Sequence, residues 1–308
     1  SVHMSVLPLF HTGGLNCYSN VVFHSGGTVA VMRTFEPAQA LRLLTDPTYG
    51  FTHFFGVPAN YLFMSQQPEF EAADLGRLSI CGVGGAPCAL SIIETWGRKG
   101  VGLQQGYGMT ETSPSVLVLD AHMALQKPGS TGLPVLHNEV RLVDEAGNDV
   151  AETDVIGELW VKGPNVTPGY WNRPDATAES ITDGWLHTGD AARRDGDGYY
   201  YIVDRWKDMF ISGGENVYPA EVENVIYALD GVAEVAVIGL PDERWGEVGQ
   251  AVVALKPGAG LSEADILKHC DGRLARFKIP KSVRFIEALP RNATGKVLKR
   301  ELREPSAA

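Results

Sequence analysis

Apolar strand-like runs alternate with helical stretches from residue 5 to about residue 106, and this alternation restricts the possible folds more than any other feature. The strand-like runs are 28–32, 51–55, 78–83 and 102–105, and the helical stretches are 37–44, 59–65 and 89–98. Parallel strands need a long crossover connection, usually a helix, whereas antiparallel strands can be joined by a short turn. The alternation therefore predicts an α/β layer on a mostly parallel sheet.

The pattern changes after Pro128. Three short apolar runs, at 140–143, 157–161 and 199–203, are separated there by Gly, Pro, Asn and Asp. These four residue types favour turns, each for its own conformational reason. Short strands separated by turns predict an antiparallel β subdomain.

A third pattern begins near Arg205. Pro219 is suited to the first turn of a helix, and apolar residues then recur on one face. Strand-like runs follow at 235–240, 251–255 and 283–286, and a capping sequence at Ser262 predicts a further helix to about 269. We therefore expect a large domain at 1–205 and a small α+β domain at 206–308.

Charge and composition exclude some classes of function. The chain has 26 Lys and Arg against 37 Asp and Glu, a net charge of −11 that opposes binding to nucleic acid. It contains no signal sequence and no apolar run near the roughly 20 residues that span a bilayer, so we expect a cytoplasmic protein without a transmembrane anchor. Four cysteines without metal-like spacing favour buried thiols. Monomer and homodimer both remain open.

Three glycine-containing strings follow the predicted strands. Gly84-Gly85-Ala86-Pro87 and Gly106-Tyr107-Gly108-Met109-Thr110-Glu111 each come directly after a strand, and Trp185-Leu186-His187-Thr188-Gly189-Asp190 ends in a Gly-Asp pair. Glycine lets backbone approach a ligand closely, an aromatic ring can stack, and a carboxylate suits Mg²⁺ or a ribose diol. Taken singly, each string is also compatible with an ordinary turn.

Two further strings lie in the last third of the chain. Residues 204–219 combine charges, paired glycines and a helix start at the predicted domain boundary, which fits either a hinge or a charged surface loop. Residues 290–299 place Lys296 after a Thr-Gly pair, where a lysine can reach phosphate or carboxylate oxygens as a point charge. A lysine in a basic tail is more often only solvated.

All five strings, in this order, resemble the adenylate-forming (AMP-binding) superfamily of acyl-CoA synthetases, luciferase-like enzymes and peptide-synthetase adenylation domains. The similarity covers nearly the whole chain and is most specific at 199–219. It is greatest to bacterial fatty-acyl-CoA synthetases. The fold implied is part of a large adenylate-forming domain, with an α/β sheet and an antiparallel β subdomain, followed by a small mobile α+β lid.

The resemblance also implies roles for individual residues in binding ATP or AMP. Tyr107 would stack on adenine, Asp190 and Arg205 would bind the ribose hydroxyls, and Lys296 would bridge the carboxylate and the α-phosphate. Thr110 would contact phosphate, and Glu111 would hold Mg²⁺. The remaining implied nucleotide contacts are Gly85, Ala86, Pro87, Gln105, Gly106, Gly108 and Met109.

A second set of implied roles concerns coenzyme A and the acid. Lys207 would be the hinge about which the lid turns between acyl-adenylate formation and thioester formation. Gly213 and Gly214 would line the pantetheine tunnel, and His11 would be a wall of the acid pocket. The residues implied to hold the nucleotide of coenzyme A are Trp245, Phe277, Lys278 and Lys281; both aromatics are also compatible with ordinary packing.

The sequence departs from the family pattern in one respect. The Ser/Thr/Gly-rich phosphate loop ending in Pro-Lys-Gly is absent, and Ser25-Gly26-Gly27-Thr28 does not replace it because it lacks the lysine. We expect the loop upstream of residue 1. Because such loops bind phosphates through their backbone N–H groups, we expect little adenylating activity from these 308 residues alone.

The sequence leaves several functional alternatives open. A medium- or long-chain fatty acid is the first expectation for the substrate, and an aromatic or cyclic acid the second. A peptide-synthetase domain or a luciferase-like enzyme would share the same motifs, as would an inactive nucleotide-binding fragment. Products formed with and without coenzyme A would separate these enzymes. A non-enzyme that binds only a protein partner is a further alternative, and titration with AMP, ATP and coenzyme A would identify it, because a pure interaction module should bind none of the three.

Overall fold

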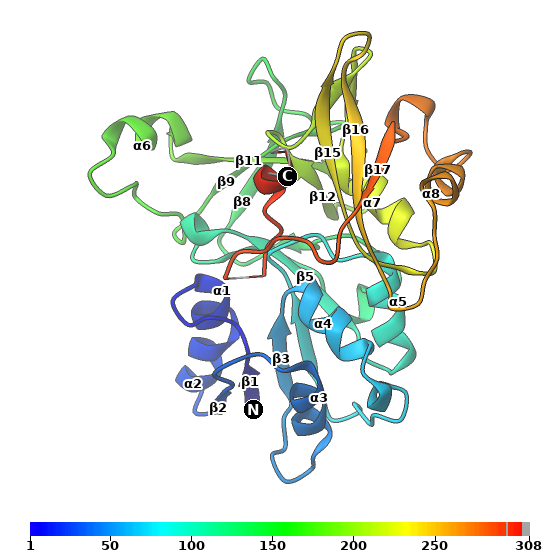
Figure 1. Ribbon diagram of the computed structural model, residues 1–308. Coiled ribbons are helices and arrows are strands. Elements are labelled where there is room, and N and C mark those ends of the chain that lie inside the picture. Colours follow the sequence, from blue (N-terminus) through cyan, green and yellow to red (C-terminus); the bar gives the residue numbers. More distant parts are fainter. Residues whose placement is uncertain (294, 304–308) are drawn as a thin grey trace. The chain divides into compact units, whose positions relative to one another are not determined.

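The computed structural model describes residues 1–293 and 295–303 and divides into two compact units (Figure 1). The first unit comprises Ser1–Thr188 and Ala192–Ile202, and the second comprises Gly189–Ala191 and Val203–Ala308. The division therefore passes through one β-sheet. The boundary expected between residues 205 and 206 remains a prediction.

The first unit contains a seven-stranded sheet whose first five strands are parallel, as the alternating pattern predicts. In spatial order the strands are β2 (Thr28–Val31), β1 (Val2–Ser5), β3 (His53–Gly56), β4 (Ile80–Val83), β5 (Leu103–Gly108), β6 (Ser115–Val118) and β7 (Leu133–Pro134). Strands β6 and β7 are antiparallel to their neighbours. Strand β5 is longer than expected and carries Gly106 and Tyr107 within it.

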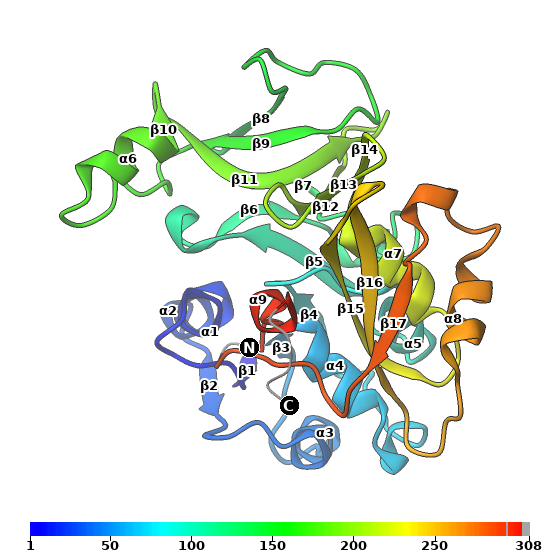
Figure 2. The ribbon, with the colours of Figure 1, turned by 45° about the horizontal axis from the view of Figure 1, so that its top comes forward.

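Helices cover both faces of this sheet. The larger predicted helices are confirmed as α3 (Pro37–Thr45), α4 (Pro58–Ser65) and α5 (Leu90–Arg98). The sequence analysis does not predict α1 (Thr12–Gly14), the π-helix η1 (Leu15–Ser19) and α2 (Asn20–His24), which form one continuous helical stretch. Figures 1 and 2 show α1 and α2 on one side of the sheet and α3 and α4 on the other. Short 3-10 turns lie at η2 (Pro68–Phe70), η3 (Thr110–Thr112) and η4 (Ala121–Met123).

Aromatic packing fixes the helical layer of α4 and α5 against the sheet. The fully buried Trp96 of α5 meets the ring of Tyr61 of α4 edge-on, with ring centroids 4.9 Å apart, and donates from Nε1 to the Tyr61 carbonyl at 3.1 Å. The Tyr61 hydroxyl in turn donates to the Gly82 carbonyl at 2.8 Å. Because edge-to-face rings and a satisfied buried hydroxyl both stabilise a core, this chain of contacts fixes the end of β4 from which the first glycine string emerges.

A second sheet is antiparallel, as predicted. Its strands are β10 (Ile181–Thr182), β11 (Trp185–Arg194), β9 (Gly157–Lys162) and β8 (Glu139–Val143), with β12 (Tyr200–Arg205) on β11 and helix α6 (Pro174–Ser180) nearby in the chain. Strand β11 is a correction, because the sequence analysis expected only a turn or a binding loop in its first half. Gly189 lies within this strand with φ +68°, a left-handed conformation that favours glycine, and a glycine in a string of this kind predicts a turn rather than a strand.

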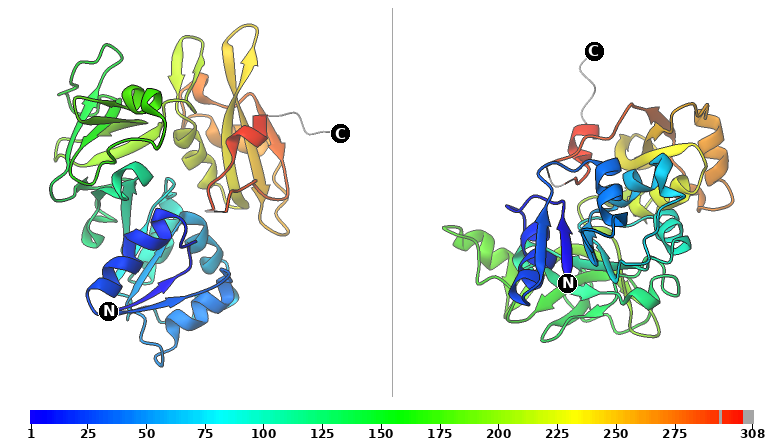
Figure 3. Two further views of the ribbon diagram at one scale, coloured as in Figure 1. Left: turned by 90° about the vertical axis from the view of Figure 1, so that its left-hand side faces the viewer. Right: turned by 90° about the horizontal axis from the view of Figure 1, so that it is seen from below.

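The second unit is the α+β body expected after residue 205. Its strands, in spatial order, are β14 (Glu215–Val217), β13 (Phe210–Ser212), β16 (Gly246–Leu255) and β15 (Val232–Asp242), with β17 (Ser282–Phe285) parallel to β16. Its helices are α7 (Pro219–Tyr227), α8 (Glu263–Cys270), the 3-10 turn η5 (Arg276–Lys278) and α9 (Lys299–Arg303). Figure 3 shows β15 and β16 side by side.

Alternation along β15 and β16 builds two separate cores in this unit. Val235 and Val237 face the core that α7 and α8 cover, whereas Ala236 and Ile238 face a core containing Leu289 and Leu302. Successive side chains of a strand point to opposite faces, so one sheet can support both layers. The C-terminal segment that carries Lys296 therefore packs on the face opposite α7.

The predicted capping sequence of α8 is confirmed. Ser262 Oγ accepts from the Asp265 backbone N–H at 3.3 Å, and the Asp265 carboxylate accepts from the Ser262 N–H at 2.9 Å. Ser262→Ala should lower the free energy of unfolding by about 1 kcal/mol, because the first turn loses its acceptor. Thermal unfolding of this unit measures the loss, and Ser262→Thr, which keeps the hydroxyl, should lose less. Equal losses in both variants would contradict the capping role.

None of the helices within residues 1–293 and 295–303 has the length and apolar character needed to cross a membrane.

Candidate nucleotide-binding site

The first glycine string forms an exposed loop directly after β4. Gly85 has φ +79°, a left-handed conformation that favours glycine, and Gly85, Ala86 and Pro87 are all exposed. A Cβ at the preceding Gly84 would lie 3.0 Å from the Gly106 carbonyl oxygen. The first two strings therefore lie next to each other at the carboxyl ends of adjacent parallel strands, where open α/β sheets bind ligands.

Gln105 holds this loop through its side chain. Its Oε1 accepts from the Cys88 N–H at 3.3 Å, and its Nε2 donates to the Ser130 carbonyl at 3.0 Å. The side chain is buried, and both its oxygen and its nitrogen are hydrogen-bonded. The nucleotide contact that the resemblance implies for Gln105 would therefore come from its backbone, while its amide positions the Gly84–Pro87 loop.

The second string is fixed by close backbone packing. A Cβ at Gly108 would lie 1.6 Å from the Pro114 carbonyl oxygen, so only glycine fits there. Thr112 Oγ1 accepts from the Met109 N–H at 3.0 Å and lies 2.8 Å from the Pro114 carbonyl oxygen, to which it donates. These contacts hold the short turn η3 that carries Thr110, which is exposed, and Glu111, which is half-buried.

A segment far along the chain supports the same turn. Asn165 Nδ2 donates to the carbonyls of Thr112 and Ser115 at 2.7 and 3.0 Å, and the Thr167 N–H donates to the Glu111 carbonyl at 2.7 Å. Tyr170 donates from its hydroxyl to Glu111 Oε1 at 2.9 Å. Burial and the adjacent Glu111 raise the pKa of Tyr170, so the phenol stays protonated as a donor.

Sequence reasoning did not find Tyr170. The residue lies 59 positions after Glu111, and no local pattern marks the pair. An acidic side chain in a predicted ligand loop does signal that an orienting donor is needed, but it does not say which residue supplies it.

If Glu111 holds Mg²⁺, as the resemblance implies, Tyr170→Phe should weaken Mg²⁺ binding by the full-length gene product. A hydrogen bond to a charged group is worth about 1.5–3 kcal/mol when buried and less here, because Tyr170 is 37% exposed. We expect the Mg²⁺ concentration for half-maximal acyl-adenylate formation to rise roughly 3- to 10-fold, measured at saturating ATP. An unchanged Mg²⁺ dependence would contradict an orienting role for Tyr170. Tyr49→Phe, at an exposed tyrosine distant in sequence, is the matched control.

The second unit brings together Asp190, Arg205 and Lys296. Arg205 Nε lies 3.3 Å from Asp190 Oδ1, and the Asp190 side chain is 7% exposed. Burial lowers the pKa of Lys296; Arg205 acts in the same direction, whereas Asp190 and Asp208 oppose it. The charges of Asp190 and Arg205 therefore both act on the Lys296 ammonium, and we refer to the three residues as the charge cluster. Thr294, from the same sequence string, lies outside the described residues.

The glycine pair of the 204–219 string forms the turn of a hairpin between β13 and β14. Gly213 has φ +62°, and a Cβ there would lie 2.8 Å from Cε3 of Trp245, whose ring therefore covers it. Lys281 Nζ lies 5.8 Å from the centre of the same ring, a cation–π distance. Gly214 has φ +87° and open space where a Cβ would be. Gly213, Trp245 and Lys281 thus lie together, and their roles in binding coenzyme A remain predictions.

Phe277 and Lys278 make structural contacts in this unit. Phe277 packs against the core beneath α7 and α8, and Lys278 Nζ lies 2.7 Å from a carboxylate oxygen of Glu221. Two alternatives were given for Phe277, coenzyme A binding and ordinary packing. Part of its side chain is packed against the core, as the second alternative states. The proposed hinge residue Lys207 is exposed.

His11 caps the first helical turn of the stretch that the sequence analysis does not predict. Its Nδ1 accepts from the Gly13 N–H at 3.1 Å, and a Cβ at Gly13 would lie 3.8 Å from the Phe55 ring. His11 and Phe55 are therefore neighbours at the carboxyl end of β3. This places His11 near the glycine loops of the same unit, because a Cβ at Gly84 would lie 3.5 Å from the Phe55 ring.

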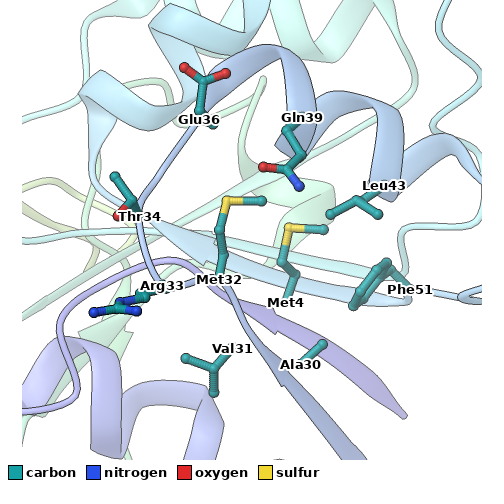
Figure 4. A pocket seen from close by; sticks show the side chains of 10 residues that line it. All are labelled: Met4, Ala30, Val31, Met32, Arg33, Thr34, Glu36, Gln39, Leu43 and Phe51. Carbon is teal, nitrogen blue, oxygen red and sulfur yellow. The ribbon is translucent and has the colours of Figure 1, made fainter.

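A hollow of about 430 Å³ lies elsewhere in the first unit, between β1, the edge strand β2 and α3 (Figure 4). Met4, Met32, Leu43 and Phe51 form its apolar walls. None of the residues predicted to bind nucleotide, acid or coenzyme A lines this hollow. The candidate residues therefore form two groups, the loops in the first unit and the charge cluster in the second unit.

The loops at the strand ends of the first unit and the charged residues of the second unit are the candidate ligand-binding groups of the chain. The sequence matches the family of AMP-binding enzymes over residues 1–171 and the C-terminal domain of AMP-binding enzymes over residues 221–296. The chain therefore belongs to the AMP-binding enzyme family, as its motifs predict.

Known proteins of this family resemble the chain closely. The feruloyl-CoA synthase of an Amycolatopsis species is 46% identical over 96% of this chain and 60% of that protein. The long-chain-fatty-acid–CoA ligase FadD13 of Mycobacterium tuberculosis is 41% identical over 98% of this chain and 59% of that protein. ATP-bound MatB from Rhodopseudomonas palustris is 38% identical with a TM-score of 0.90, over 98% of this chain and 59% of MatB.

These comparisons confirm the adenylate-forming α/β fold with a large and a small domain. They also show that the chain spans about 60% of the length of the relatives it matches.

Proposed function

We propose that this chain is part of an AMP-forming acid–thiol ligase. In the first step, a carboxylate oxygen attacks the α-phosphorus of ATP. The bond from this phosphorus to the oxygen that bridges to the β-phosphate breaks, and pyrophosphate leaves. In the second step, the sulfur of coenzyme A attacks the acyl carbon, AMP leaves, and the thiol proton passes to solvent. The observation that carries the proposal is the pairing of Asp190 with Arg205 at 3.3 Å, together with the effect of both charges on Lys296. A buried carboxylate suits ribose hydroxyls, and two cations suit phosphate and carboxylate oxygens.

The other predicted residues take supporting roles in this proposal. Gly85–Pro87 and the backbone of 105–109 would bind adenine, with Tyr107 stacking on it. Glu111 would hold Mg²⁺ together with the phosphates of ATP, since Mg²⁺ is commonly bound by one or two carboxylates plus substrate oxygens. Thr110 would contact phosphate. The proposed contacts with coenzyme A are Gly213, Gly214, Trp245, Phe277, Lys278 and Lys281, and Lys207 would be the hinge.

The acid remains to be identified, and two classes are supported. A medium- or long-chain fatty acid is supported by the 41% identity to FadD13. An aromatic acid is supported by the higher identity to feruloyl-CoA synthase and by ring packing near His11. The rings of Phe55 and Tyr18 are tilted at 45° to each other with centroids 5.2 Å apart, and a Cβ at Gly82 would lie 2.5 Å from Tyr18 Oη. These rings therefore limit the space behind the glycine loop.

An acid panel tests the proposal. The full-length gene product and the 308-residue chain would each be incubated with ATP, Mg²⁺, coenzyme A and either saturated fatty acids of medium and long chain length or ferulate. We expect AMP and an acyl-CoA from the full-length product and little of either from the chain alone. AMP release without acyl-CoA would point to another acceptor, and the absence of any acid-dependent AMP would refute the proposal.

A further inference from the structure

Lys296 lies on a short connection between Arg291 and Lys299. The ion pairs made by these two residues attach the connection to the rest of the second unit. We propose that Arg291 and Lys299 are positioning residues for Lys296. Each holds one side of this connection by pairing with a carboxylate, Arg291 with the buried Glu234 and Lys299 with the half-buried Glu223. The proposal rests on the proposed function of Lys296 in forming the acyl-adenylate. It concerns residues that lie within one unit, so it depends on nothing outside that unit.

Arg291 clamps the turn that precedes Lys296. Its guanidinium pairs with Glu234 of β15 and also donates from Nη1 to the Gly295 carbonyl at 2.7 Å. Glu234 is 6% exposed, and its second oxygen accepts from the Leu289 N–H at 3.2 Å. One planar guanidinium therefore joins the buried Glu234 carboxylate on the sheet to Gly295, the residue directly before Lys296. The fixed fork of N–H donors in arginine reaches both acceptors at once, which the single ammonium of lysine cannot reproduce.

The turn itself is closed by hydrogen bonds across it. The Asn292 N–H donates to the Lys296 carbonyl at 2.9 Å, and the Lys296 N–H donates to Asn292 Oδ1, also at 2.9 Å. Arg291 and Val297 form an antiparallel bridge beside them. The backbone of Lys296 is thereby fixed relative to Arg291.

Lys299 anchors the other side. Its Nζ lies 2.7 Å from Glu223 Oε1, and the two side chains are 18% and 17% exposed. Burial acts to lower the pKa of Lys299, but Glu223 and Asp204 raise it, so the ammonium stays charged between them. Glu223 also accepts from the Val237 N–H at 2.8 Å, which ties the cluster to β15.

The same cluster holds the segment that carries Arg205. Asp204 accepts from the Arg205 N–H at 2.7 Å and from the Ala220 N–H at the start of α7 at 2.9 Å. The charge of Asp204, the residue next to Arg205, also acts on the Lys299 ammonium. A lysine side chain has a long flexible stem, so its ammonium is placed accurately only if its backbone is fixed. The two anchors supply that constraint.

A split between the two half-reactions tests the proposal. Arg291→Lys, made in the full-length gene product, keeps the positive charge. It cannot both pair with Glu234 and donate to the Gly295 carbonyl as arginine does. Acyl-adenylate formation, measured as acid-dependent exchange of pyrophosphate into ATP, should fall by about 10- to 100-fold. Thioester formation from synthetic acyl-adenylate and coenzyme A should change by less than about 2-fold. Lys256→Met, which removes an exposed lysine paired with Asp230, is the matched control.

A double-mutant cycle separates positioning from general damage. If Arg291 acts through Lys296, then Arg291→Lys should have almost no further effect on acyl-adenylate formation in a Lys296→Met background. Equal losses in both half-reactions, or an undiminished effect in that background, would overturn the proposal. If Arg291→Lys does not fold, Lys299→Arg replaces it in the same two rate measurements and in the same Lys296→Met background.

The control arms also separate this inference from the proposed function. If Lys296→Met leaves acyl-adenylate formation unchanged, the proposed function of Lys296 fails. If Lys296→Met removes it but Arg291→Lys and Lys299→Arg do not affect it, only the positioning role fails.

Discussion

Lys296→Met should lower the rate of acyl-adenylate formation by the full-length gene product by about 10²–10³-fold, which corresponds to about 2.7–4 kcal/mol of barrier. Negative charge builds up on the oxygens around the α-phosphorus as the carboxylate attacks, and a fixed cation stabilises that charge more than it stabilises the bound substrates. Methionine keeps most of the stem of lysine and removes only the charge and its donors. The measurement is acid-dependent exchange of pyrophosphate into ATP at saturating substrates.

The second half-reaction provides the contrast for this prediction. Thioester formation from pre-formed acyl-adenylate should be nearly unaffected by Lys296→Met, because the proposed role of Lys296 ends when pyrophosphate has left. Lys268→Met removes an exposed lysine of α8 in the same unit and should change neither rate. A loss confined to thioester formation would contradict the role of Lys296.

Gly108→Ala should destabilise the first unit by about 3 kcal/mol. The added Cβ would lie 1.6 Å from the Pro114 carbonyl oxygen, so the backbone of β5 or of the turn after it must move. Overpacking of this kind typically costs about 1–3 kcal/mol, and a backbone oxygen cannot rotate away as a side chain can. The fall in Tm of the first unit should be about 6–12 °C, since 1 kcal/mol corresponds to roughly 2–4 °C in a domain of this size.

Gly106→Ala is the matched control for stability. It lies on the same strand, two residues earlier, and its Cβ would find no atom closer than the Leu117 carbonyl oxygen at 3.8 Å. Its Tm should stay within about 2 °C of the parent, because surface changes without strain usually cost less than about 0.5 kcal/mol. AMP titration of both variants would then report on the ligand loop. Equal fall of Tm in both variants would contradict the packing argument for Gly108.

The candidate site was only partly predictable from the sequence. The glycine strings after β4 and β5, Asp190, Arg205 and Lys296 were found because each motif is compact and its resemblance to known adenylate-forming enzymes is specific. The orienting partners were not found. Tyr170 lies 59 residues from its partner Glu111, and Glu234 lies 57 residues from its partner Arg291. Tyr170 and Glu234 both lie outside the motifs.

The sequence by itself determined the parallel α/β layer, the antiparallel subdomain, the small α+β unit and the helix caps such as Ser262. These features depend on the spacing of apolar residues and on short-range hydrogen bonds, which act within a few positions of the chain. Only the tertiary structure decided that Gly189 lies within β11, that residues 12–24 are helical, and that the two sides of the Lys296 connection are attached to Glu234 and Glu223. The physical reason is that a buried charge needs a partner close in space, and packing of distant segments brings that partner near.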